Sequence, residues 1–508
     1  MPRSKLTSII ARIGQKQRNF SRLLALVLAP IVVTCSEKIP RPSIGENIAR
    51  PISLVNDEQG DFFYVLNTDL KHRYDDGSIL IVDRQGERRK AVSVPRLGRH
   101  LSLSGKDLIA TFDRGVETEA SSKVMLFQIG GATDQGEMPT LTLKKSWNVD
   151  NCNPINAIMQ GGLIAVSCQT GKLMLGQLAE DRSTSTLDVI REYPAYVRRA
   201  LYIDEPRGLL YAFVSDWGTA KLKDQIYTDN KSFNETSAIM VEGVANDVPD
   251  ELEKTKQGRL KIATQTNPFQ FVVIDLNKEK ADLDQGHFQL RSFDKVASKE
   301  MRWLYFNLQH PNGDFDTSLD NDQKFYRTNF WAAHPDPSAS DTFYLSQRTN
   351  ETTGSAQYSN NIVKVRVTGT RDDILDATKE TKSVFAFERI FGGKDTLQTD
   401  GSRYLADFAL EQNGGKTSAV YVSSFRSLAN FKNESFALFA APTDQAKAKE
   451  ASTVTSSSDI ERSFFAFAFA PKTSSSPRTL VAASFYGDSL SFFTIDDNLT
   501  FSDEKQLH

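Results

Sequence analysis

Residues 61–83 read DFFYVLNTDLKHRYDDGSILIVD, and this stretch decides the fold that the sequence predicts. An apolar segment, a polar gap and a second apolar segment follow one another, which is typical of two β-strands joined by a loop. Alternation in the second segment predicts a half-buried strand. The gap between the two segments is densely charged and includes Lys71, His72 and Arg73. Its role depends on where the fold places it.

The strand–gap–strand pattern recurs along the chain, and we count seven copies. The first is residues 61–83, and the others are residues 106–129, 161–178, 207–222 with 237–244, 340–367, 417–442 and 478–496. Residues 261–276, KIATQTNPFQFVVIDL, are a possible extra piece of the fourth copy. Internal repetition of this kind is typical of solenoids, propellers and other repeat folds.

Another short apolar segment precedes each later copy. These segments are LSL (101–103), INAIM (155–159), ALYI (200–203), FWAA (330–333) or WLYF (303–306), LADFAL (405–410) and FFAFAFA (464–470). Four short strands per repeat predict an all-β β-propeller with seven four-stranded blades and long loops on one face. The surplus length falls in insertions near residues 215–260, 307–342 and 430–460, so we expect one propeller domain over residues 52–508. A β-sandwich or a β-helix is an alternative that explains the repetition less well.

The first copy resembles the YVTN-type β-propeller repeat. Tyr64, Val65, Asn67, Gly77 and Asp83 carry the resemblance, while later copies keep only the hydrophobic spacing. The resemblance implies a ring related to lactonase-like propellers, a fold that hosts both enzymes and binding proteins.

The N-terminus predicts export. Basic residues precede the apolar residues 23–33, which are too few for a transmembrane helix of about 20 residues. We therefore expect a signal peptide over residues 1–34. Cys35 follows it in a context that resembles a bacterial lipobox, with Val32 and Thr34 at the preceding key positions and Ser36 favouring the outer membrane. The hypothesis is a lipidated Cys35 and a tether over residues 35–51, and the alternative is an ordinary signal peptide with a nearby cysteine.

Two further cysteines, Cys152 and Cys168, flank an apolar–Gly-Gly–apolar segment. A hairpin that turns near Gln160 and Gly161 would place the two thiols opposite each other, within disulfide distance. Export permits oxidation, so we predict a disulfide, with two free buried thiols as the alternative.

The formal net charge of −3 gives no overall basic field, so we expect no nucleic-acid partner. No histidine or cysteine spacing typical of a metal site occurs, and we predict neither a metal nor a cofactor. The segment with Asp314, Asp316, Asp320 and Asp322 favours a solvated acidic loop over a calcium site.

Within a propeller blade, the loops between the second and third strands share one face of the ring with the junctions between blades. Five of these loops are long and polar, and surface loops on a rigid scaffold often carry binding residues. Arginines also stand where several innermost strands are expected to start, and the Arg fork suits planar anions. The candidate ligand-binding residues are Arg99, His100, Arg198, Arg199, Arg302, Arg403, Arg462, Lys71, His72 and Arg73. The alternative is that each Arg forms a structural ion pair with an Asp of a neighbouring blade, for which Asp113, Asp204, Asp216 and Asp407 are available.

The sequence therefore predicts a monomeric, lipid-anchored envelope propeller that binds through its loop-rich face. The expected partner is an envelope protein, a polysaccharide or a small anionic ligand, and the only membrane contact is the lipid anchor. No residue is assigned a catalytic role. The alternative is a lactonase-like hydrolase, or an anion-binding propeller, in which arginines hold the substrate and His100 acts as a base.

Overall fold

A computed structural model of the chain describes residues 41–508 with several gaps. The gaps are residues 58, 71–72, 114–120, 132–136, 180–181, 183–185, 193–195, 216–268, 277–289, 293–327, 350–360, 377–380, 393–402, 414–415, 427–435, 443–451, 458–463 and 474–475.

The described strands form seven four-stranded antiparallel sheets, each built from strands that are consecutive in the chain. Blades 1 to 3 consist of β1 (Pro51–Asn56), β2 (Phe62–Asn67), β3 (Gly77–Asp83), β4 (Arg89–Val94), β5 (Gly98–Ser104), β6 (Asp107–Phe112), β7 (Lys123–Gly130), β8 (Thr140–Asn148), β9 (Pro154–Gln160), β10 (Leu163–Cys168), β11 (Lys172–Gln177) and β12 (Asp188–Glu192). Blades 4 and 5 consist of β13 (Tyr196–Asp204), β14 (Leu209–Ser215), β15 (Phe269–Asp275), β16 (Leu290–Ser292), β17 (Thr328–Pro335), β18 (Thr342–Thr349), β19 (Asn361–Val367) and β20 (Phe385–Gly392). Blades 6 and 7 consist of β21 (Arg403–Asn413), β22 (Lys416–Arg426), β23 (Phe436–Pro442), β24 (Ser452–Ser457), β25 (Phe464–Ala470), β26 (Arg478–Ser484), β27 (Ser489–Ile495) and β28 (Phe501–Leu507).

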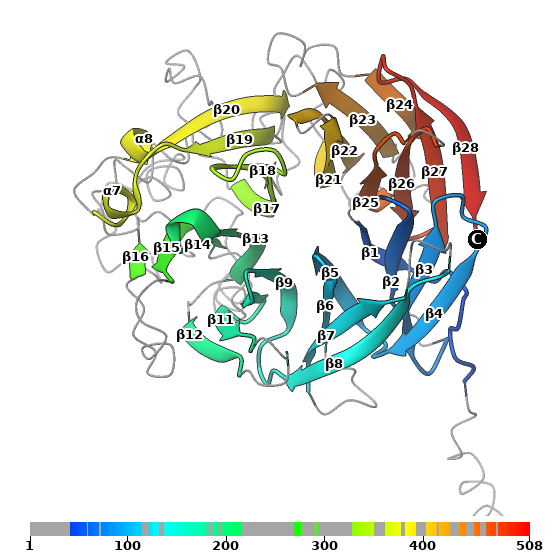
Figure 1. Cartoon of the computed structure of the whole chain (residues 1–508), viewed down its shortest axis with the longest axis horizontal. Coiled ribbons are helices and arrows are strands. Elements are labelled where there is room, and N and C mark those ends of the chain that lie inside the picture. Colours follow the sequence, from blue (N-terminus) through cyan, green and yellow to red (C-terminus); the bar gives the residue numbers. More distant parts are fainter. Residues whose placement is uncertain are drawn as a thin grey trace, which may run out of the picture.

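The sheets are arranged as a ring around a central channel, with the first strand of each blade innermost (Figure 1). This arrangement confirms the predicted all-β β-propeller. We letter the strands of a blade A to D from the channel outwards. The B–C face carries the B–C connections and the D–A junctions between blades, and the A–B face carries the A–B and C–D connections.

Two expected strands are placed differently. In blade 4, β14 pairs with β15, from Ser215 opposite Phe269 to Leu209 opposite Asp275. The third strand is therefore the segment that the sequence suggested only as an extra piece, and not residues 237–244. In blade 5 the innermost strand is β17, which contains FWAA, so the alternative WLYF segment at residues 303–306 is not this strand.

The hydrophobic core lies between neighbouring blades. Along β2, Phe63 and Val65 pack toward blade 7, whereas Tyr64 and Leu66 pack toward blade 2. Both faces of the sheet are therefore covered, and every residue of β3 is buried as well. The expectation of a half-buried strand was wrong, because each inner strand lies between two blades and has no solvent face. Each such apolar side chain contributes about 1.5–3 kcal/mol through burial.

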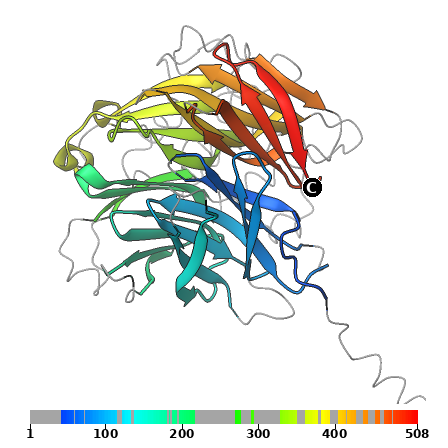
Figure 2. The same ribbon diagram turned by 45° about the vertical axis from the view of Figure 1, so that its right-hand side comes forward.

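The ring closes without exchange of a strand between its ends. Blade 1 is formed by the start of the described chain and blade 7 by its end, and the two lie side by side in both ribbon views (Figures 1 and 2). Innermost strands β1 and β25 are in contact. On the A–B face, buried Arg84 of blade 1 donates hydrogen bonds to the carbonyl oxygens of Ala470, Pro471 and Pro477. We call these contacts between blades 7 and 1 the ring-closing seam.

Long connections occur on both faces. The longest, residues 216–268 and 293–327, join β14 to β15 and β16 to β17, so both belong to the B–C face as expected. Long loops were expected on the B–C face only, and this was wrong. Its C–D connection in blade 5 holds two short helices, α7 (Arg371–Leu375) and α8 (Thr381–Val384), while one A–B turn contains the 3-10 helix Glu205–Arg207.

Candidate functional site

The charged loop between β2 and β3 is built around a buried carboxylate. Asp69 accepts hydrogen bonds from the backbone N–H groups of Arg73 at 2.9 Å and Tyr74 at 2.7 Å. Its carboxylate also lies 4.0 Å from the Nε of Arg96, which is buried too. An aspartate that satisfies the N–H groups of its own loop stabilises that loop conformation. Lys71 and His72 lie outside the described residues.

The two remaining aspartates of this loop bind the N-terminal segment. Asp76 accepts hydrogen bonds from the Ile44 N–H at 2.8 Å and the Ser43 hydroxyl at 2.7 Å. The Asp75 N–H donates to the Pro42 carbonyl at 3.1 Å, and Ile44 is fully buried. Residues 42–49 are therefore packed on blade 1, and the expectation of a tether up to residue 51 was wrong for this part. Cys35 and the signal peptide lie outside the described residues.

Arg73 takes part in the ring-closing seam. Its guanidinium donates to Asp488 of blade 7 at 3.0 Å. The same carboxylate accepts the backbone N–H of Arg50 at 2.7 Å, and the Arg50 side chain lies 5.1 Å from the ring centroids of both Phe485 and Tyr486. Sequence reasoning missed Arg50 and Asp488. The position of Arg50 just before an innermost strand was a usable signal, because the same criterion selected Arg99 and Arg403.

The arginine candidates do not form an equivalent set of positions. The pairing between A and B strands shifts register in every blade, and Arg99 lies in the shift of β5 while Arg198 and Arg199 lie in that of β13. Arg403 is instead the first residue of β21, before its shift between Leu405 and Phe408. At the corresponding shifts, other blades carry apolar residues: Ile52, Ile155, Trp331 and Phe465. The sequence pattern therefore does not produce a symmetric arginine ring.

The side chain of Arg99 is paired. Its Nε donates to the Asp113 carboxylate at 2.8 Å, and its Nη2 contacts the same oxygen. Arg99 therefore forms a structural ion pair, but with an aspartate of its own blade and not of a neighbouring blade as the alternative expected. Of the other candidates, Arg198, Arg199 and Arg403 belong to described strands but their side chains are not described, and Arg302 and Arg462 lie outside the described residues.

The central channel contains a cavity of about 460 Å³ whose lining includes residues from all seven innermost strands. His100 lines it on β5, together with Asn156 on β9. The cavity reaches the A–B face, where the ends of the innermost strands contribute residues such as Asp57 and Gln160. Of the three candidate ligand-binding residues whose side chains are described, Arg73, Arg99 and His100, only His100 lies in this lining.

A histidine and an aspartate meet across two blades inside this cavity. His334 of β17 places Nε2 3.5 Å from Oδ1 of Asp407 on β21. The imidazole also packs edge-on against Phe408, with ring centroids 4.5 Å apart. Sequence reasoning considered Asp407 only as a partner for an arginine and gave His334 no role. Contact between residues so far apart in sequence depends on ring geometry, which local patterns do not contain.

Three A–B turns begin with an aspartate that accepts a backbone N–H of its own turn: Asp57, Asp204 and Asp336. Asp204 and Asp336 are buried, and Asp57 is partly buried. Tyr211 donates its hydroxyl hydrogen to Asp204 at 2.9 Å, and Tyr344 donates to Asp336 at 3.4 Å. Burial raises the pKa of Asp57 and of Asp204 above the ordinary value, and it raises the pKa of Tyr211 as well. These pairs stabilise turns at the ends of the inner strands. Asp204 also pairs with Arg207 of the same turn, and Asp216 lies outside the described residues.

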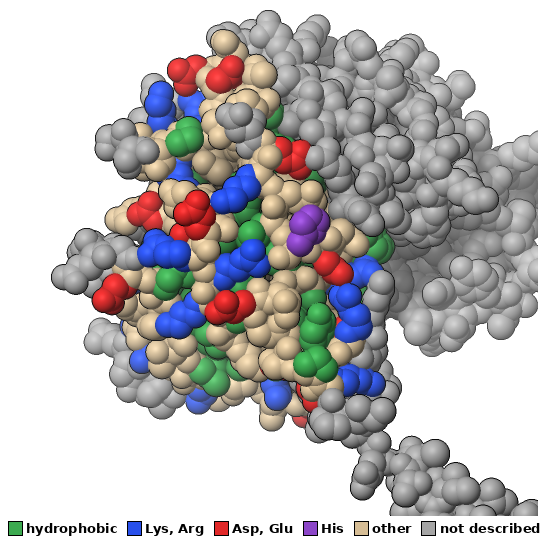
Figure 3. Space-filling model, turned by 90° about the vertical axis from the view of Figure 1, so that its right-hand side faces the viewer, with side chains coloured by type: hydrophobic (Ala, Val, Ile, Leu, Met, Phe, Trp, Pro, Cys, Tyr) green, Lys and Arg blue, Asp and Glu red, His purple; other side chains and the backbone are tan. Residues whose placement is uncertain are grey.

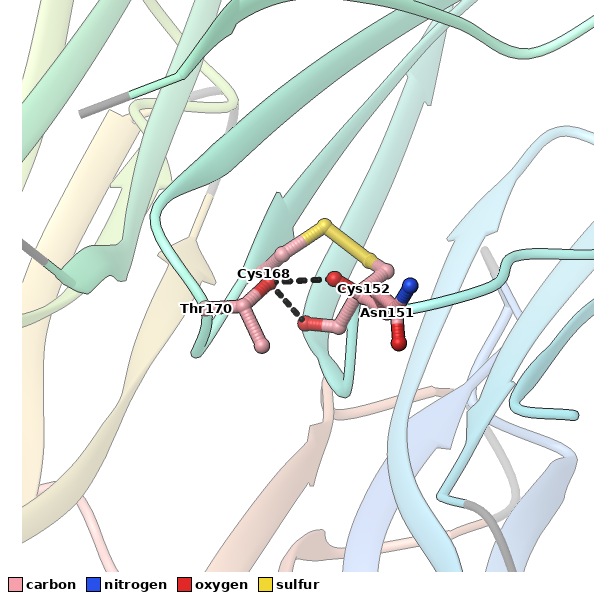
Figure 4. The surroundings of a disulfide bond; sticks show 4 residues. All are labelled: Asn151, Cys152, Cys168 and Thr170. Carbon is pink, nitrogen blue, oxygen red and sulfur yellow. Dashed lines mark hydrogen bonds between the residues drawn. A yellow bond between two sulfur atoms is a disulfide. The ribbon is translucent and has the colours of Figure 1, made fainter. Parts of the chain in front are cut away.

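Cys152 and Cys168 form a disulfide, with Cα atoms 4.8 Å apart (Figure 4). The hairpin turns at Gly161–Gly162, both with positive φ, so Cys168 lies opposite Pro154 and not opposite Cys152. Cys152 reaches its partner from the preceding turn, where the Thr170 hydroxyl donates to the carbonyl oxygens of Asn151 and Cys152. The predicted register was therefore wrong by a few residues, because the turn is centred later.

Within the described residues, no group of three or more His, Cys, Asp or Glu side chains is arranged to hold a metal ion. No helix in the same part of the chain is long and apolar enough to cross a membrane. On the side of the ring that carries β4 and β28, basic and acidic side chains are interspersed (Figure 3).

No protein-family model matches the sequence, and no curated protein sequence matches it either. Solved structures of similar fold include a periplasmic gluconolactonase of Pseudomonas aeruginosa, with a TM-score of 0.49, 10% identity and coverage of 88% of this chain and 96% of that one. The β-propeller domain of Cps50 (Swd1) from Myceliophteria thermophila has a TM-score of 0.47 at 10% identity, with 89% and 98% covered. A Lactobacillus plantarum protein has a TM-score of 0.44 at 12% identity, with 91% and 96% covered. Likeness at this level carries no argument about function.

The strand order and the ring therefore define the class of this chain, a β-propeller with four-stranded blades. The resemblance of its first blade to YVTN-type repeats stays a prediction.

Proposed function

We propose that this chain is an exported, lipid-anchored β-propeller that acts as a binding module of the cell envelope. It binds an envelope protein or polysaccharide through the B–C face. The observation that carries this proposal is the position of the two longest connections, residues 216–268 and 293–327, which follow β14 and β16 of the fourth blade on that one face. Long loops on a rigid scaffold are a common basis of recognition.

Two further observations support the proposal. The Cys152–Cys168 disulfide suits an oxidising compartment outside the cytosol. Arg73 and Arg99 are the two candidate arginines whose side chains are described, and both pair with aspartates. They therefore give no support to an anion-binding or lactonase-like site at the channel opening on this face.

The test is affinity capture from an envelope extract with two shortened variants. Ser215 and Phe269 are directly opposite each other in the sheet, so a short Asn-Gly turn can replace residues 216–268 without changing the pairing of β14 with β15. A matched variant shortens residues 443–451, which join β23 to β24 on the A–B face. We expect the partner to be captured by the full chain and by the second variant only. Equal capture by the variant that lacks residues 216–268 would contradict binding through this loop.

A further inference from the structure

The described side chains that line the cavity in the central channel include acidic groups, whereas the anion site expected on the B–C face would be lined by arginines. The described lining of the cavity contains the carboxylates of Asp57 and Asp407 and the imidazoles of His100 and His334, but no Lys or Arg. The same described lining includes apolar groups such as Leu201 and Phe467. A carboxylate beside apolar walls favours a cationic ligand with an apolar body, because a low-dielectric cavity strengthens charge–charge attraction.

Local backbone geometry places Asp407 in this cavity. The pairing of β21 with β22 shifts register between Leu405 and Phe408, so Asp407 lies in an irregularity of the ladder. Irregularities of this kind redirect side chains and are frequent next to binding sites. The Phe408 N–H donates to Asp407 Oδ1 at 2.8 Å, which holds the carboxylate in place.

Among the described residues, the only charged or titratable neighbour that pairs with Asp407 is His334, at 3.5 Å. His334 Nε2 makes no hydrogen bond with the described residues, so this contact does not use the acceptor capacity of the Asp407 carboxylate. Asp57 differs from Asp407, because two backbone N–H groups of its turn, those of Asp61 and Phe62, point at its carboxylate. Asp407 is therefore the carboxylate that is left with capacity for a ligand, and its side chain is 24% exposed.

We propose that the central channel binds a small organic ammonium ion, with Asp407 as its counter-ion and His334 beside that carboxylate. The site lies between blades 5 and 6 and is reached from the A–B face. It is separate from the surface proposed above for a macromolecular partner, and either proposal can fail alone. A metal ion is a poorer occupant, because one carboxylate and one imidazole do not complete a coordination shell.

Three probes of similar size test which ligand charge the cavity prefers: benzylammonium (positive), benzyl alcohol (neutral) and benzoate (negative). Their binding to the mature propeller is followed near neutral pH by ligand-observed saturation-transfer NMR and by thermal shift. We expect the ammonium ion to bind most tightly and benzoate not to bind. Equal or tighter binding of benzyl alcohol or benzoate would overturn the proposal.

Two variants then test the role of Asp407 in this binding. Asp407→Asn keeps an acceptor for the Phe408 N–H and removes the charge, and we expect it to weaken benzylammonium binding by about tenfold or more. Asp372→Asn, which removes an exposed carboxylate outside the cavity lining, serves as the matched control and changes affinity by less than about threefold. Thermal unfolding verifies that both variants are folded. Unchanged affinity in Asp407→Asn, or an equal loss in both variants, refutes the role of Asp407.

Discussion

Asp488 accepts a hydrogen bond from the backbone N–H of Arg50 at 2.7 Å, although the two residues are 438 positions apart in the chain. The same carboxylate pairs with Arg73 at 3.0 Å, so one aspartate of blade 7 holds two segments of blade 1. Because no strand is exchanged between the ends of the chain, the closure of the ring depends on side-chain contacts of this kind. Phe63 and Phe492 add an edge-to-face contact across the same seam.

Removal of the Asp488 carboxylate should weaken the ring. Asp488→Ala leaves the Arg50 N–H and the Arg73 guanidinium without this acceptor. The Arg50 guanidinium also loses an ion-pair partner 3.7 Å away, and the site is only partly exposed. We expect a loss of about 2 kcal/mol in the free energy of unfolding, measured with urea. The control is Asp497→Ala, which removes an exposed partner of Arg478 and should cost less than about 0.5 kcal/mol. Equal stability of the two variants would show that the seam does not depend on Asp488.

The strands of the blades could be predicted from the sequence because each strand depends on a short-range pattern of residues. Phe62–Asn67 and Gly77–Asp83 are strands as predicted, since apolar runs bounded by turn residues are a short-range signal. Residues 237–244 and 303–306 misled the assignment because short apolar segments inside long insertions look like strands. Whether an apolar segment becomes a strand depends on which neighbouring strand it can pair with. The pairing of Ser215 with Phe269 could therefore not be predicted from either segment alone.

The candidate site was harder to predict for a similar reason. The expected arginine at the start of each innermost strand holds only in part, because Arg302 does not immediately precede β17. Arg50 and Arg99 also lie at different places relative to the register shifts and contact different aspartates. The contact between His334 and Asp407 joins two blades, so no spacing in the sequence indicates it.

The disulfide should stabilise the folded state, because it restricts the conformational freedom of the unfolded chain. Cys152 and Cys168 are 16 positions apart and both are fully buried. A closed loop of this length is worth about 3 kcal/mol in the chain-entropy description. We therefore expect the double variant Cys152→Ala/Cys168→Ala to lose about 2–3 kcal/mol in urea unfolding, and a reductant to lower the stability of the unmodified protein but not of the variant. Two free thiols in mass spectra of exported protein would contradict this prediction.

The pH dependence of stability should contain a contribution from Asp204. Burial raises its folded-state pKa above the ordinary value of 3.8 for an aspartate, although Tyr211 and Arg207 act in the opposite direction. A raised pKa means that the folded state binds the proton more tightly than the unfolded state. The contribution is therefore present below the unfolded-state pKa and is lost as pH rises through the folded-state pKa. We expect Asp204→Asn to become more stable relative to the unmodified protein as pH rises through that window, measured by urea unfolding at several pH values.

A second variant distinguishes the titration of Asp204 from the effect of its hydrogen bonds. Tyr211→Phe removes the hydroxyl that donates to Asp204 and keeps the ionisable group. Because that hydrogen bond favours the ionised carboxylate, its loss should raise the pKa of Asp204 further and extend the window to higher pH. A difference between Asp204→Asn and the unmodified protein that is constant with pH would contradict the assignment to Asp204.

Membrane attachment should depend on Cys35 alone. Ser43 and Ile44 are bound by Asp76 of blade 1, so the chain from Cys35 to Ser43 spans at most about 28 Å at roughly 3.5 Å per residue. A lipid on Cys35 would thus hold blade 1 close to the bilayer surface. We expect Cys35→Ser to move the protein from the membrane fraction to the soluble exported fraction, because no other predicted feature of the mature chain binds a membrane. Incorporation of a labelled fatty acid should be lost in parallel, whereas the Cys152→Ala/Cys168→Ala variant should keep both the label and the membrane location. Membrane fractionation that is unchanged in Cys35→Ser would refute the lipid anchor.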